Sequence, residues 1–256
     1  MAEPSRTELS RRAFTRGTLG SLLTYSLLET LSAADAFGEE IKPITAPWLK
    51  EVNDISVELK GQPLEQLQWQ QQIEGLMKQV DLPELLMFID FEKLTANIPF
   101  RDKGERSLRP RLPKVEGLPT NLVFGHQVFA LQKDRSVVPH GHNNMATAFL
   151  ILKGDFHGRH YDRLEDGDDH MIIKPTIDRA FTAAEYSSIS DYKDNVHWFK
   201  ATSETAFIYN IHVLNLDTGE GKRGGRVYID PAGEELSGGR IKARKASFPE
   251  VHKLYG

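Results

Sequence analysis

Short apolar runs separated by turn residues mark the second half of the chain. Beyond Asn121 they recur at short intervals, a pattern typical of an all-β sandwich or barrel. The pattern predicts strands at residues 122–132, 146–153, 156–161, 170–174, 179–186, 196–201, 205–216 and 226–229. We therefore expect an all-β core, a β-barrel domain over residues 101–235, followed by a C-terminal tail at 236–256.

The first half of the chain carries a helical pattern instead. Its apolar residues recur at the spacings of one helix face, as in Leu64, Leu67, Ile73, Leu76 and Met77. A second helical segment is predicted from residue 83, a proline near a helix start, to residue 94. We expect an N-terminal helical extension at residues 37–100 that packs beside the barrel. The stretch 99–119, dense in Arg, Lys, Pro and Gly, is predicted to be a connecting loop.

The N-terminus has the features of an export signal. Arg11 and Arg12 precede an uncharged, mostly apolar stretch at 17–28, and Ala34 and Ala36 offer a cleavage site. This arrangement resembles a bacterial twin-arginine signal peptide, here residues 1–36. It predicts export by the twin-arginine machinery to the periplasm. The apolar stretch is shorter than the roughly 20 residues of a membrane-spanning helix, so no stable membrane anchor is expected. The alternative is a surface helix that contains two adjacent arginines.

Composition limits the chemistry that this chain can perform. A formal net charge of −4 gives no basic field able to neutralise several phosphates, so no nucleic-acid partner is expected. The absence of cysteine excludes disulfides, cysteine metal sites and a cysteine nucleophile. Any site must therefore rest on His, carboxylate, Tyr or Ser side chains.

Two histidines, His140 and His142, stand two positions apart. In an extended strand this spacing points both imidazoles to one face, where they can chelate a single ion. Alone, the pattern is equally compatible with a surface pair that binds nothing. Its surroundings favour a site, because Pro139 precedes the pair and an Asn-Asn turn and an apolar run ending at Gly154 follow it.

This segment resembles the first motif of the cupin superfamily, a His-x-His strand followed by a hairpin that glycine closes. Most metal-binding cupins add a glutamate four or five residues after the second histidine, where this chain has Ala146 and Thr147. A more specific resemblance is to the thiol dioxygenases of the cysteamine dioxygenase and plant cysteine oxidase group. It rests on His140-Gly141-His142-Asn143-Asn144-Met145, Gly154, His157 and Tyr161-Asp162.

A second motif strengthens this resemblance. The run Asn195-Val196-His197-Trp198-Phe199-Lys200-Ala201 is similar to the group's N-[IL]-H-x-F-[KR]-A segment, whose histidine is the third iron ligand. The resemblance covers roughly residues 121–230 and implies a jelly-roll double-stranded β-helix. It also implies one Fe(II) held by His140, His142 and His197, with Zn, Mn or Ni as other possible ions. The implied substrates are O2 and a small thiol or thiol-bearing peptide.

The resemblance breaks at two positions. Counted from His197, an aspartate that the group has near its metal falls on Tyr209, and the tyrosine of its turn falls on Asn215. The predicted strand 205–216 puts both on one face. We therefore expect Tyr209, with Tyr161 or Arg226, to orient the substrate.

These changes keep a second hypothesis open, a three-histidine metal-binding cupin without oxygenase activity. Such a protein would be a binding or sensing module, or a hydrolase or isomerase that uses Zn or Mn. The missing carboxylate ligand favours the dioxygenase, whereas the changes at Tyr209 and Asn215 favour the alternative. Structural roles are expected for the other candidate histidines, which are His126, His157, His160, His170 and His212. Among them His212 is the first to reconsider, because it lies in an apolar strand.

Overall fold

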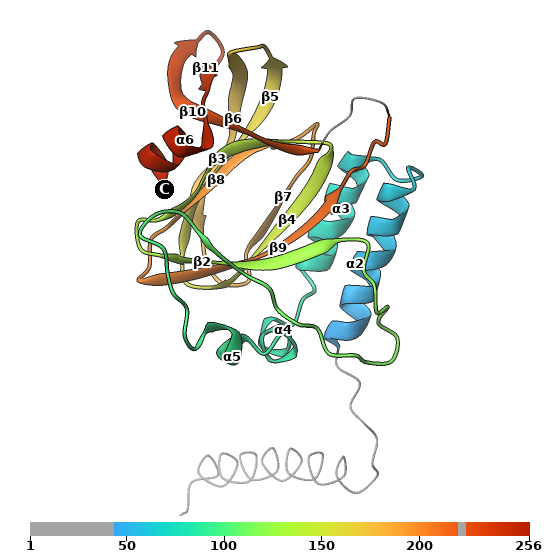
Figure 1. Ribbon diagram of the computed structural model, residues 1–256. Helices are drawn as coiled ribbons and strands as arrows, with labels where there is room; N and C mark the ends of the chain where they lie inside the picture. Colours follow the sequence, from blue (N-terminus) through green and yellow to red (C-terminus); the bar gives the residue numbers. More distant parts are fainter. Residues whose placement is uncertain (1–43, 220–223) are drawn as a thin grey trace, which may run out of the picture. The chain divides into compact units, whose positions relative to one another are not determined.

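The computed structural model describes residues 44–219 and 224–256 (Figure 1). The predicted signal peptide at 1–36 lies outside these residues. The strands are β1 Arg106–Leu108, β2 Gly125–Gln132, β3 Ser136–Asn143, β4 Met145–Lys153, β5 Phe156–Asp166, β6 His170–Phe181, β7 Tyr186–Ile189, β8 Val196–Ala201, β9 Thr205–Leu214, β10 Gly225–Leu236 and β11 Arg240–Lys245.

The strand order is that of a jelly roll. One sheet runs β1-β2-β9-β4-β7, and the other contains β3-β8-β5-β6 and is closed into a barrel by β10 and β11. All pairs are antiparallel, and successive strands alternate between the two sheets from β2 to β5 and again from β6 to β10. This is the double-stranded β-helix of the cupin fold, so the predicted fold class is confirmed.

Helices cover the outer face of the first sheet. They are α2 Thr45–Lys60, α3 Gln66–Met77, α4 Leu82–Phe88 and α5 Phe91–Thr95 (Figure 1). Asp81 caps α4 by accepting the amide proton of Glu84 over 3.0 Å, which fixes the start of that helix. The predicted helical extension is therefore confirmed, although its predicted apolar face is only partly right. Ile73 and Met77 are buried, whereas Leu67 is exposed.

Period-two alternation decides which side chains reach the barrel interior. On β9, Phe207, Tyr209 and Ile211 pack with the helices, whereas Ala206 and Ile208 face inward. Large apolar side chains fill the rest of the interior, next to the histidines described below. They are Phe129, Leu131, Phe149, Ile151, Phe156, Phe181, Phe199 and Ile208.

Several predicted element boundaries need correction. Residues 179–186 do not form one strand, because β6 ends at Phe181 and Glu185 then accepts the Thr182 amide proton in a turn before β7. The predicted C-terminal tail at 236–256 contains strand β11, which pairs with both β6 and β10, and helix α6 Phe248–Tyr255. The predicted loop 99–119 contains strand β1. No helix among the described residues is long and apolar enough to cross a bilayer.

Candidate metal centre

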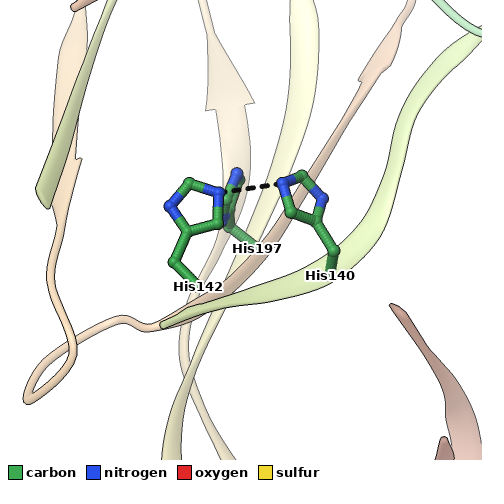
Figure 2. A group of neighbouring side chains, drawn as sticks. All are labelled: His140, His142 and His197. Carbon is green, nitrogen blue, oxygen red and sulfur yellow. Dashed lines mark hydrogen bonds between the residues drawn. The ribbon is translucent and has the colours of Figure 1, made fainter. Parts of the chain in front are cut away.

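Two neighbouring strands bring the three predicted ligands together. His140 and His142 lie on β3, and His197 lies directly opposite His140 on β8. One ring nitrogen of each lies within 4.8 Å of the others, and Figure 2 shows the three rings turned toward one another. All three residues are at most 3% exposed. The structure therefore confirms that these histidines form one buried cluster.

Hydrogen bonds orient two of the three rings. His140 donates its Nδ1–H to the carbonyl oxygen of Val138 over 2.7 Å. Because a carbonyl can only accept, the lone pair of His140 lies on Nε2, which is 3.0 Å from Nε2 of His142. The Nδ1 atom of His142 lies 3.3 Å from Oγ1 of Thr147. Both Nε2 atoms are thus turned to the centre of the cluster.

The surroundings keep these imidazoles neutral. Burial lowers the pKa of each histidine well below its usual value of 6.5. The positive charge of Arg226 lowers the pKa of His140 and of His142 further. Neutral imidazoles at neutral pH offer lone pairs, as divalent transition metals require. The cluster can therefore bind one metal ion, and its three nitrogen donors do not select between iron, zinc, manganese and nickel.

Arg226, which is predicted to orient the substrate, lies beside the cluster. On β10 it stands opposite His142, and Tyr228 stands opposite His140, so that both share the face of the ligands. The Tyr228 and His140 ring centroids are 5.8 Å apart. A long ion pair of 3.9 Å joins Arg226 Nη1 to Oε1 of Glu105, in the segment just before β1. This part of the cluster's surroundings is polar and contains charges of both signs.

The structure does not bring the predicted tyrosines to the histidines. Tyr209 is fully buried on the helix-covered face of β9, and its hydroxyl oxygen lies 3.2 Å from Nδ1 of His126. Tyr161 packs with Met171 and Val196 on the face of β5 that points away from the cluster. These placements contradict the predicted roles. Asn215 follows the end of β9 with a φ of 56°, so it does not share a strand face with Tyr209.

Other polar residues, which the sequence did not single out as substrate-facing, point into the barrel. Asn210 and His212 continue the inward-facing series of Ala206 and Ile208 on β9, and Gln127 on β2 pairs with Asn210. The His212 ring lies against Gly125, where an added Cβ would be 2.2 Å from Nε2. Burial is the main cause that lowers the pKa of His212 to about 4, and Arg226 adds to it. Only the structure shows which face of β9 is inward, so no signal in the sequence identifies Asn210 and His212.

Comparison with known proteins adds little to this picture. No protein-family model matches the chain, and no curated protein matches it. Procruciferin, an 11S globulin from Brassica napus, is 15% identical with a TM-score of 0.32, over 42% of this chain and 23% of that chain. The chain thus spans under a quarter of that globulin.

Two other solved structures are similar at the same low level. An uncharacterized conserved protein with a double-stranded β-helix domain from Klebsiella pneumoniae is 8% identical with a TM-score of 0.33, over 48% of this chain and 82% of that chain. A putative sugar phosphate isomerase from Acidithiobacillus ferrooxidans is 11% identical with a TM-score of 0.27, over 35% of this chain and 49% of that chain. Likenesses this weak do not bear on function, and the cupin fold rests on the strand order above.

Proposed function

We propose that this chain is an exported, Fe(II)-dependent dioxygenase that converts a small thiol and O2 into a sulfinic acid. The observation that carries the proposal is the donor set. His140, His142 and His197 are neutral and buried, and no carboxylate joins them within the described residues. Bound Fe(II) would supply the redox chemistry that adds both oxygen atoms of O2 to the thiol sulfur.

The charge of the site favours an anionic substrate. Three neutral ligands leave the full charge of a divalent ion in place, and Arg226 adds a positive charge beside it. A thiolate, or a thiol that also bears a carboxylate, is attracted to such a site. The Arg226 guanidinium and the Tyr228 hydroxyl would orient the substrate. Phe149, whose ring centroid is 4.9 Å from that of His197, closes the inner side against water.

A second candidate function has one specific observation in its favour. His212 is a neutral imidazole that faces the barrel interior. Such a group suits general acid–base chemistry in a hydrolase or isomerase that uses Zn or Mn in the same cluster. It suits a thiol dioxygenase less directly, because a metal ion already lowers the pKa of a bound thiol.

Oxygen uptake separates these functions. The chain from residue 37 onward, purified anaerobically and loaded with Fe(II), is assayed for O2 consumption with a panel of small thiols. The matched controls are His197→Ala, which removes a ligand, and His157→Ala, which removes an imidazole on β5 that is bound to Asp178 instead. Uptake with a sulfinate product that only His197→Ala abolishes supports the proposal. One bound ion per chain without thiol-dependent uptake refutes it and favours the second candidate.

The proposed location has its own test. Export of a folded protein by the twin-arginine route would let the chain acquire iron before it crosses the membrane. Replacing Arg11 and Arg12 with lysine is expected to retain the protein in the cytoplasm, as measured by cell fractionation. Unchanged export of that variant would refute this part of the proposal.

A further inference from the structure

A fourth histidine, His160, lies inside the barrel beside the cluster. It stands opposite His197 in the β5–β8 pair, so both imidazoles occupy the interior face. Their ring centroids are 6.0 Å apart with an interplanar angle of 71°. His160 is fully buried and also stacks on Phe181. Sequence reasoning assigned this residue a purely structural role.

Two buried nitrogen atoms in this pair have no hydrogen-bond partner among the described residues. They are Nδ1 of His160 and Nδ1 of His197. A histidine that binds a metal almost always donates its other ring N–H to an acceptor, which fixes the ring. His140 and His142 have such neighbours in the Val138 carbonyl and the Thr147 hydroxyl. His197 is the ligand that lacks one.

The two rings can adopt complementary protonation states. With Nε2 as its ligand atom, as in His140 and His142, His197 carries its proton on Nδ1 and needs an acceptor there. Nε2 of His160 lies 3.4 Å from Oγ of Ser187. When Nε2–H of His160 donates to that hydroxyl, its Nδ1 is left as an acceptor. Neither Nδ1 atom has a direct partner, so a hydrogen-bonded link between the two rings would have to pass through a water molecule.

We propose that His160 is a positioning residue of the metal centre. Its Nδ1 accepts a hydrogen bond from Nδ1–H of His197 through one water molecule, and Ser187 holds His160 in the tautomer that can accept. This inference rests on the proposed metal-binding function, because a ring that bound no ion would not need to be fixed in this way. It does not depend on which reaction the ion performs.

Cobalt(II) titration tests the proposal without any measurement of turnover. The visible absorption of bound Co(II) reports the ligand geometry, and competition with a chelator gives the affinity. We expect His160→Ala to weaken Co(II) binding about 10- to 100-fold and to alter the spectrum. His160→Asn places an amide oxygen near the position of Nδ1, so it should restore most of the affinity. His160→Gln places its amide near the position of Nε2 and should not. Ser187→Ala should weaken binding by a smaller factor.

The outcomes are distinguishable. Affinity unchanged in His160→Ala would overturn the positioning role, and so would equal losses in the Asn and Gln variants, which would indicate packing alone. His157→Ala, on the same strand, should bind Co(II) like the wild type. If His160→Ala does not fold, as judged by circular dichroism, the comparison of Ser187→Ala with the wild type decides. If the wild-type protein itself binds no Co(II), the proposed metal function fails rather than the role of His160.

Discussion

Acid should unfold the metal-free protein at a pH where most globular proteins remain stable. Four histidines in the barrel interior are at most 3% exposed: His140, His142, His160 and His197. Burial lowers the pKa of each, to about 3 for His160. Their pKa in the unfolded chain is near 6.5. Below that pH the unfolded chain binds more protons than the folded one, so stability falls as the pH falls.

The size of this effect follows from the unfolded pKa and the pH, for imidazoles that stay neutral in the folded chain. Keeping one imidazole neutral at pH 5, when its unfolded pKa is 6.5, costs about 2 kcal/mol of folding free energy. Four such groups cost about 8 kcal/mol, against a typical total of about 5–15 kcal/mol for a domain. Burial raises the pKa of Asp191 and Asp194, which acts in the opposite direction. The metal-free barrel should therefore lose most of its stability between pH 7 and pH 5.

Urea denaturation at a series of pH values measures this loss. Tryptophan fluorescence would follow unfolding between pH 7.5 and pH 5 in the presence of a chelator. His160→Phe removes one of the four groups. The number of protons that the chain binds on unfolding, given by the slope of the unfolding free energy against pH, should therefore fall by about one. Saturating Zn2+ should shift the loss to lower pH, because the ion competes with protons for three of the rings. A free energy of unfolding that stays constant between pH 7 and pH 5 would refute the reasoning.

Three further substitutions test the placement of other residues. Arg226→Gln should raise the KM for an anionic thiol about tenfold and tighten Co(II) binding, since it removes a positive charge; equal kinetics in steady-state assays would contradict this. Gly125→Ala should lower the free energy of unfolding, measured by urea denaturation, by about 1–3 kcal/mol, because the new Cβ overlaps the His212 ring. An unchanged free energy of unfolding would show that the ring moves freely. Tyr209→Phe should lower the free energy of unfolding by about 1 kcal/mol and leave turnover unchanged. A tenfold loss of turnover would instead place Tyr209 in the site.

Sequence reasoning identified the fold and the three clustered histidines because both leave strong local signals. The two motifs around His142 and His197 and the regular short strands are readable without tertiary information. Strand β11 was missed because Arg240–Lys245 reads as a charged tail. Only Ala243 in that strand is fully buried, where it closes the barrel beside β6.

The orientation of the tyrosines was beyond the sequence for a physical reason. Helices cover one face of β9 and the barrel interior covers the other, so apolar residues occur on both faces of the strand. Such a strand shows no alternation that tells inside from outside. Counting from a family motif placed Tyr209 near the metal, whereas its neighbour Asn210 has the inward parity. A shift of one position exchanges the two faces of a strand.

Thr147 contacts one of the clustered histidines. With Ala146 it occupies the two positions at which the resemblance to metal-binding cupins leads us to expect a glutamate, and its hydroxyl oxygen lies 3.3 Å from Nδ1 of His142. The position therefore orients a ligand instead of supplying a negative one. Together with Arg226 opposite His142, this leaves the charge of a bound ion uncompensated on the side of β10. An anionic substrate would supply the negative charge that three neutral histidines do not, which links the donor set of the cluster to the class of molecule that the proposed site should select.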